Sequence, residues 1–195
     1  MIASSLRGLR WMVLGLAVLA GAAGAQMVIQ GARYESGITL GGQPLVLNGA
    51  GVRKRLVFDI YVGGLYVPKR AARTEDLVSQ PGSKRVALRF LRDVEGELFV
   101  NSLHVGLKAN HTEAELARWQ KQIDTLTTTI KTIALARRGD TVYFDYTPQD
   151  GTRVSVNGVT RGPLIPGDDF YAAVLRVWIG ETPADAGLKK GMLGG

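Results

Sequence analysis

The chain has 195 residues, of which 46% are hydrophobic and 21% are charged, and it contains no Cys. The length suits a single domain or at most a small pair, and the lack of Cys excludes disulfides, thiolate nucleophiles and Cys-ligated metal centres. Only two His residues are present, His104 and His111, which disfavours a histidine-built metal site or a Ser-His-Asp triad. Ordinary hydrolytic or metal-dependent chemistry is therefore not expected.

The net charge of +7 comes from 24 Lys and Arg against 17 Asp and Glu. The basic residues lie in short, scattered clusters, whereas nucleic-acid binding would require a basic stripe with interleaved aromatic residues. We therefore expect no nucleic-acid partner. A weak attraction to anionic lipids or acidic ligands is compatible with the charge.

The first 25 residues have the tripartite pattern of a secretory signal peptide. Arg7 and Arg10 precede an apolar run over residues 11–23, and Ala23-Gly24-Ala25 forms a small-x-small cleavage pattern. The run is too short for a membrane span, which needs about 20 residues. We therefore expect cleavage near Ala25, a periplasmic or secreted product, no stable membrane span, and one domain over residues 26–195.

The first part of this domain reads as strands and turns. Residues 31–44 are expected to form a turn-rich lead-in, followed by a short strand over 45–47. Asn48-Gly49 between apolar runs is a strong hairpin signal. A long strand is expected over 52–67, and the paired Gly63-Gly64 inside it indicate a bulge, a bend or a close approach by a ligand or backbone.

The rest of the chain mixes helical and strand patterns. Apolar residues recur at helical spacing from Val94 to Asn110, and Thr112 with Glu115 fits a capping box before a long amphipathic helix. The other expected elements are a short helix from Thr74, strands over 85–91, 141–146 and 152–156, a helix over 170–179 and a last helix near Leu188. This order predicts an α+β fold, an antiparallel sheet with helices packed on one face.

One arginine stands in an unusual setting. Arg53 follows Gly49-Ala50-Gly51-Val52 at the entry of the long strand, so small residues crowd around a single guanidinium. A guanidinium suits bidentate binding of a carboxylate or another planar oxyanion. On spacing alone, an exposed basic turn followed by a strand explains the same residues.

The two His residues lie seven apart, which could place them near one helix face. A periplasmic haem or metal carrier could use one of them, such as His104, as an axial ligand. The ordinary interpretation is a half-buried helix His104 and a loop His111. Asp168-Asp169 is similarly interpreted as a helix N-terminal cap rather than a metal site.

Several segments together resemble the chalcone isomerase family. They are Gly49-Ala50-Gly51-Val52-Arg53, the run from Phe58 to Val67, the strand from Val86 to Leu91, Pro166 to Phe170, and Trp178 to Pro183. The resemblance covers nearly all of residues 26–195 and is closest to a bacterial, exported branch. It implies an open-faced β-sandwich, in which helices pack on a large antiparallel sheet and a ligand cleft lies between them.

The resemblance does not extend to the polar groups of the plant isomerases. Arg53 matches the family's substrate-binding arginine, but Tyr61 stands at the threonine position of the next strand. The positions of the catalytic tyrosine, the asparagine and the late serine or threonine fall near Phe99, Gly106 and Val177. Losing hydrogen-bonding groups from a dry site costs orders of magnitude in rate, so chalcone cyclisation is not expected.

A second branch of the family binds fatty acids without catalysis. Its carboxylate is held by the motif arginine and by a tyrosine thirteen residues later, which here correspond to Arg53 and Tyr66. An odd separation puts two residues on opposite faces of an ideal strand, so the pair can converge only through a bulge, expected at Gly63-Gly64. Tyr61 is a secondary candidate ligand.

These observations predict an exported, non-catalytic protein that binds a fatty acid or similar small amphipathic acid through Arg53, Tyr66 and Tyr61, with no cofactor. One alternative is an intramolecular lyase or isomerase in which Arg53 supplies electrostatic stabilisation and Tyr61 or Tyr66 donates a proton. A second alternative is a periplasmic haem- or partner-binding module that uses His104.

Overall fold

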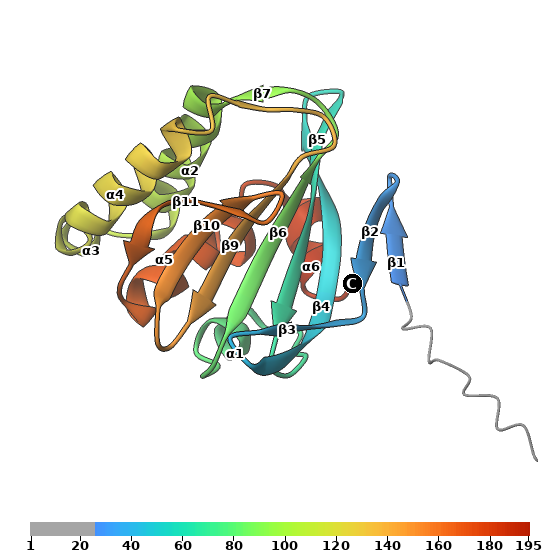
Figure 1. Ribbon diagram of the computed structural model, residues 1–195, viewed down its shortest axis with the longest axis horizontal. Coiled ribbons are helices and arrows are strands. Elements are labelled where there is room, and N and C mark those ends of the chain that lie inside the picture. Colours follow the sequence, from blue (N-terminus) through green and yellow to red (C-terminus); the bar gives the residue numbers. More distant parts are fainter. Residues whose placement is uncertain (1–25) are drawn as a thin grey trace, which may run out of the picture.

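The computed structural model describes residues 26–195, so the expected signal peptide lies outside the described residues. Seven strands form one antiparallel sheet in the order β11-β10-β9-β6-β5-β4-β3, which is visible in Figure 1. In chain order they are β3 (Gly37–Leu40), β4 (Gln43–Arg55), β5 (Phe58–Val67), β6 (Lys84–Phe90), β9 (Thr141–Thr147), β10 (Gly151–Val156) and β11 (Val159–Ile165).

Helices cover one face of this sheet. They are α1 (Thr74–Val78), α2 (Gly96–Asn110), α3 (Glu113–Arg118), α4 (Gln120–Lys131), α5 (Asp168–Ile179) and α6 (Ala186–Met192). Their apolar side chains share one buried cluster with inward-facing residues of the sheet, among them Leu65, Leu88 and Phe144. A two-stranded ribbon, β7 (Val94–Glu95) with β8 (Leu135–Ala136), joins the start of α2 to the end of α4. The expected α+β architecture is confirmed.

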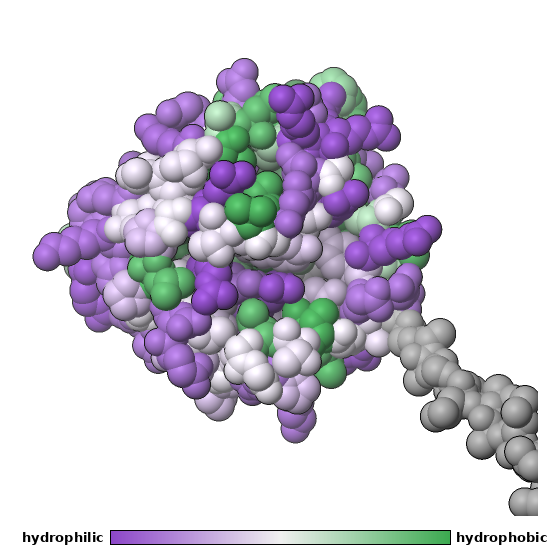
Figure 2. All heavy atoms as spheres, in the orientation of Figure 1, coloured by the Kyte–Doolittle hydropathy of each residue, from purple (hydrophilic) through white to green (hydrophobic). Residues whose placement is uncertain are grey.

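The opposite face is covered only in part, by the hairpin of β1 (Gln26–Ile29) and β2 (Ala32–Glu35). Tyr34 anchors this hairpin, because its ring is buried and its hydroxyl donates to the carbonyl of Val62 at 2.8 Å. Strands β2 and β3 occupy residues that were expected to form a turn-rich lead-in. The remaining sheet surface carries a mixture of hydrophilic and hydrophobic side chains, as Figure 2 shows.

The hairpin turn lies at Leu56-Val57, so both the turn expected at Asn48-Gly49 and the unbroken strand expected over 52–67 are wrong. β4 runs through the expected turn, and Asn48 is an extra residue between the Leu47–Tyr66 and Gly49–Leu65 pairs, which makes it a β-bulge. Its amide nitrogen donates to the carbonyl of Met192 at 2.7 Å, and its amide oxygen accepts from the backbone N–H of Ala71 at 2.9 Å. Tertiary partners far along the chain thus override the local turn preference.

The close packing of helix α6 on β4 explains why the Gly49-Ala50-Gly51 motif contains glycines. A Cβ on Gly51 would lie 2.7 Å from the backbone oxygen of Leu188, and a Cβ on Gly49 would collide with the backbone oxygen of Gly191. The backbone of α6 therefore packs directly on β4, in a contact that a larger residue would block.

The expected bulge at Gly63-Gly64 is also wrong. β5 pairs with β6 in unbroken register from Tyr61 to Tyr66. The two glycines instead leave room for side chains that pack against the strand. A Cβ on Gly64, for example, would lie 2.5 Å from the ring of Tyr34. The bulge in β5 is at Ile60, between the Arg53–Tyr61 and Lys54–Asp59 pairs.

The helical stretch after Thr112 begins as expected and then divides. Thr112 and Glu115 form the reciprocal capping box. The single long helix expected from there is split into α3 and α4 at Trp119, whose indole N–H donates to the carboxylate of Asp169 at 2.8 Å. Within residues 26–195, every helix is too short or too polar to cross a bilayer.

Candidate functional site

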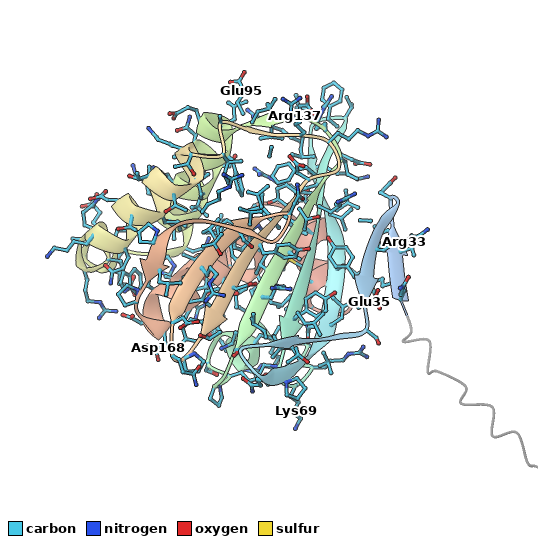
Figure 3. All side chains as sticks on the ribbon, in the orientation of Figure 1. Arg33, Glu35, Lys69, Glu95, Arg137 and Asp168 are labelled. Atoms are coloured by element: carbon cyan, nitrogen blue, oxygen red, sulfur yellow. The ribbon has the colours of Figure 1, made fainter. Side chains whose placement is uncertain are left out.

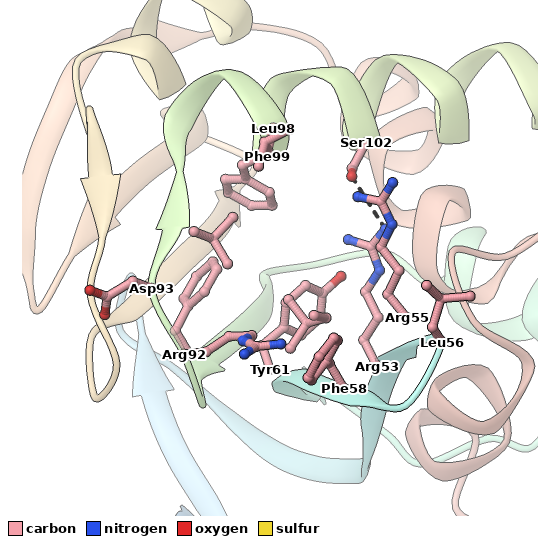
Figure 4. Close-up of a pocket in the computed structure, with 13 residues that line it drawn as sticks. Arg53, Arg55, Leu56, Phe58, Tyr61, Arg92, Asp93, Leu98, Phe99 and Ser102 are labelled. Carbon is pink, nitrogen blue, oxygen red and sulfur yellow. Dashed lines mark hydrogen bonds between the residues drawn. The ribbon is translucent and has the colours of Figure 1, made fainter.

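A cleft of about 340 Å³ lies between β5, the end of β6 and the start of α2 (Figure 4). Most of its lining is apolar, from Leu56, Phe58, Ile60, Phe90, Leu98 and Phe99. The polar side chains in the lining belong to Arg53, Arg55, Tyr61, Arg92, Asp93 and Ser102. An apolar cavity with a few convergent polar groups is the usual form of a small-molecule site.

Arg53 reaches this cleft because it faces Tyr61 directly across the β4–β5 pair. Its Nη2 donates to the hydroxyl of Ser102 at 3.3 Å, and its guanidinium carbon lies 5.5 Å from the centre of the Tyr61 ring. Its Nε is buried and has no hydrogen-bond partner among the described residues. A buried donor without an acceptor costs free energy, so an acceptor oxygen from a ligand would be stabilised here.

Tyr61 enters the same lining because of the bulge at Ile60, which lets two consecutive residues contact the cleft. Its side chain is 1% exposed, and its hydroxyl accepts from the indole N–H of Trp178 at 3.0 Å. Burial raises the pKa of this phenol, an effect that the nearby Arg53 partly offsets. Tyr61 is therefore a neutral donor, and its proton is not engaged within residues 26–195.

Two further arginines border the cleft. Arg55 lies two residues beyond Arg53, and the guanidinium of Arg92 stacks on the ring of Phe58, 4.2 Å from its centre. The carboxylate in the lining, Asp93, accepts a hydrogen bond from the backbone N–H of Arg138 at 2.7 Å. Three guanidinium groups against one carboxylate make the cleft electropositive.

Tyr66 does not join this site. It is five residues from Tyr61 in a regular strand, so its side chain emerges on the other face of the sheet. Its hydroxyl donates to the carbonyl of Glu35 at 3.1 Å, and burial raises its pKa to about 12. The structure thus brings Arg53 together with Tyr61 and not with Tyr66, because the bulge expected at Gly63-Gly64 is absent.

Tyr66 lines a second cavity, of about 480 Å³, on the face that β2 borders. Arg33 and Glu35 project from β2 at its edge (Figure 3). Its central arginine, Arg85, makes two bonds to Asp145, at 2.5 and 2.6 Å. Both Tyr66 and Arg85 in this cavity are thus already paired within the protein.

The two imidazoles connect helices. The Nε2 of His104 lies 2.7 Å from the hydroxyl of Thr127, which links α2 to α4. The Nε2–H of His111 donates to the carbonyl of Ala173 at 3.1 Å, and its ring packs edge-on against Trp119. Residues 26–195 contain no cluster of three or more His, Asp or Glu side chains suited to a metal ion.

The residues near which the resemblance places isomerase polar groups, Phe99, Gly106 and Val177, make apolar contacts. Phe99 lines the cleft and packs edge-on against Phe90. Gly106 allows α2 to approach α5, because a Cβ on it would lie 2.6 Å from the side chain of Val177. The polar residue that α2 does contribute, Ser102, stands one turn after Phe99. Helical spacing from Phe99 could have identified it.

Comparisons with known proteins give the family and a similar fold. A family model described as chalcone isomerase-like matches residues 26–194. No curated protein matches the sequence. The crystal structure of the Arabidopsis thaliana fatty-acid binding protein AtFAP1 is similar, with a TM-score of 0.66 and 18% sequence identity, over 87% of this chain and 96% of that chain. At this identity the likeness shows a shared fold.

Proposed function

The chain belongs to the chalcone isomerase-like family, and we propose that it is a non-catalytic protein that binds a fatty acid or a similar amphipathic acid in the cleft beside Arg53. The observation that carries the proposal is the buried Nε of Arg53, which has no acceptor in residues 26–195 and stands next to an apolar lining.

The acid group would be held by two donors. Arg53 offers its Nε and the remaining guanidinium protons, and Tyr61 offers its free hydroxyl proton. Hydrogen bonds between a guanidinium and a carboxylate are short, directional and stronger than neutral ones. The bond from Arg53 to Ser102, at 3.3 Å, is long enough to yield to a ligand oxygen.

The tail would lie along the aromatic and aliphatic side chains of Phe58, Ile60, Phe90 and Phe99. A volume of about 340 Å³ falls at the small end of the range for ligand pockets. It suits one acyl chain or a compact amphipathic acid rather than a large cofactor. The similar Arabidopsis protein is described as a fatty-acid binding protein, which supports this ligand class.

The binding test compares two arginines on opposite faces. Delipidated protein is titrated with fatty acids of eight to eighteen carbons, by calorimetry and native mass spectrometry. Arg53→Ala should weaken binding about ten- to hundredfold, because a hydrogen bond to a charged group contributes about 1.5–3 kcal/mol. The control Arg33→Ala, at the other cavity, should bind as the unmodified protein does. Loss of binding in Arg33→Ala but not in Arg53→Ala would refute the proposal.

The proposed function includes export. The signal-peptide pattern ends at Ala25, and the family match begins at residue 26. Fractionation and N-terminal sequencing of the expressed full chain should give a periplasmic or secreted product that starts at Gln26. Ala25→Leu should leave the leader attached. A cytoplasmic product that retains residue 1 would contradict export.

The hydroxyl proton of Tyr61, which has no acceptor in residues 26–195, favours a second candidate, an intramolecular lyase or isomerase of unknown substrate. Arg53 would stabilise a developing oxyanion, and Tyr61 would donate the proton. Chalcones and related enones, followed by absorbance, test it. Turnover above the spontaneous rate that Tyr61→Phe abolishes would establish the enzyme. Rates equal to the spontaneous ones would eliminate these substrates. We prefer binding, because Phe99 provides no hydroxyl where the isomerases need one.

A further inference from the structure

The rim of the cleft is unusually apolar for a solvent-exposed turn. The turn between β4 and β5 consists of Leu56 and Val57, which are 90% and 87% exposed, and Phe58 beside them is 50% exposed. Leu98 on α2, across the cleft, is 49% exposed. Exposed apolar residues that gather beside a pocket generally mark a binding surface.

The backbone conformation of this turn also indicates that Leu56 is not there for folding. Leu56 has a φ of +55°, in the left-handed region that a turn normally fills with Gly, Asn or Asp. The chain places a large aliphatic residue where both exposure and backbone geometry disfavour it. Neither folding nor the core explains this choice, because Leu56 and Val57 contribute little to either buried cluster.

Cations flank the apolar turn. Lys54 and Arg55 precede it on β4, and Arg92 stacks on Phe58 behind it. The Lys54 ammonium is 3.9 Å from Asp59, and its side chain remains 64% exposed. Aliphatic residues at a tip with basic residues directly behind it are complementary to a bilayer surface that carries anionic headgroups.

We propose that the Leu56-Val57 turn inserts into the headgroup region of an anionic membrane, with Lys54, Arg55 and Arg92 contacting lipid phosphates. The turn lies at the ends of strands β4 and β5 (Figure 1), in a region where Figure 2 shows hydrophobic atoms beside hydrophilic ones. Since Leu56 and Phe58 also line the cleft, docking would open the cleft toward the acyl chains. This inference rests on the proposed function and supplies its ligand route, directly from the bilayer.

A membrane fits this surface better than a protein partner does. A stable protein interface buries about 800 Å² on each side over a broad patch, whereas a two-residue turn is narrow and convex. A fluid headgroup layer adapts to such a tip without a matching pocket. The basic residues beside the turn favour an anionic surface, and in such a membrane lipid phosphates would surround the inserted turn on every side.

The test uses vesicle co-sedimentation of the mature protein, residues 26–195. Vesicles of phosphatidylcholine with 30% phosphatidylglycerol should bind it, pure phosphatidylcholine should bind at least tenfold less, and 0.5 M salt should weaken the binding. Val57→Asp should reduce the binding more than tenfold. The control Val159→Asp makes the same substitution at another exposed valine, 59% exposed, on β11, which is four strands away from β5 in the sheet. This variant should bind the vesicles as the unmodified protein does.

Val57 does not line the cleft, so Val57→Asp should retain the fatty-acid affinity of the unmodified protein in solution. Vesicle binding without fatty-acid binding would support the docking surface while the proposed function fails. Normal fatty-acid binding with equal sedimentation of Val57→Asp and Val159→Asp would overturn the docking surface alone. Concentration-dependent dimerisation that Val57→Asp abolishes would also overturn it, because a second copy would then cover the turn.

Discussion

The two faces of the central sheet each present an arginine over a cavity, but the two guanidiniums differ in what they bind. On the face opposite the helices, Arg85 is paired with a carboxylate through two short bonds to Asp145. On the helix face, Arg53 has one long bond to Ser102 and a buried Nε with no partner in residues 26–195.

The tyrosines of the two faces show the same difference. Tyr66 donates its proton to the carbonyl of Glu35, whereas Tyr61 accepts from Trp178 and keeps its proton free within the described residues. Residue type and position near a cavity therefore do not identify a ligand site by themselves. Unused hydrogen-bonding capacity beside an apolar cavity is what distinguishes the cleft at Arg53, because an external acceptor would remove the cost of a buried donor without a partner.

The largest expected effect comes from breaking the Arg85–Asp145 pair. Asp145→Ala leaves Arg85, whose side chain is 22% exposed, without its counter-ion, and should destabilise the fold by about 3 kcal/mol. Arg53→Leu should change the stability by less than about 0.5 kcal/mol, since it removes one long bond to Ser102 together with a buried donor that has no partner in residues 26–195. Urea unfolding measures both. Equal losses would mean that the two arginines are equally important for the fold, and the comparison would then fail.

A smaller effect, on fatty-acid affinity, should distinguish Tyr61 from Tyr66. Tyr61→Phe removes a donor from the cleft and should weaken fatty-acid binding about three- to tenfold, equivalent to one neutral hydrogen bond. Tyr66→Phe removes a bond on the other face and should leave the affinity unchanged. Calorimetric titration of both variants decides between them. A loss of affinity in Tyr66→Phe alone would move the ligand to the second cavity.

The smallest effect concerns an arginine on the helix side that is paired with a carboxylate. Arg176 on α5 makes two bonds to Glu75 on α1, at 2.7 and 2.9 Å, and this pairing lowers the pKa of Glu75. The stabilisation is complete above the unfolded-state pKa, about 4.3, and is lost as the pH falls through the folded-state pKa. Glu75→Gln should therefore cost about 0.5 kcal/mol at neutral pH, as exposed pairs do.

Urea unfolding of Glu75→Gln and the unmodified protein between pH 7 and pH 3 measures this difference. The two stabilities should converge at the acidic end. A difference that persists at pH 3 would assign the contribution of Glu75 to packing instead of charge.

The strand and helix segments with strong local patterns were predictable from the sequence. The strand ending at Phe90, the capping box at Thr112 and the helix ending at Ile179 all lie where spacing and capping residues place them. Asn48-Gly49 and Gly63-Gly64 misled the prediction, because their local turn and bulge preferences are overridden by distant partners, α6 and Tyr34. Local signals cannot show which distant segment will pack against a glycine.

The sequence singled out Arg53 of the candidate site but did not show which side chains would lie beside it. Arg53 was identified by its crowded glycine motif and by resemblance. Tyr61, a secondary candidate, became the partner of Arg53 because the bulge is at Ile60, and bulge position decides which face a side chain occupies. Arg55 and Arg92 had no signal beyond their charge, since only the folded sheet brings them to the rim of the cleft.

The bond between Asn48 and Met192 has a consequence for the order of folding. It joins residues 144 positions apart, and the backbone of α6 fills the space above Gly49 and Gly51. The first half of the sheet therefore cannot bury this stretch until α6 has been synthesised. Contacts of such long sequence separation slow folding, so the last turns of the chain should control how late the domain becomes resistant to proteases.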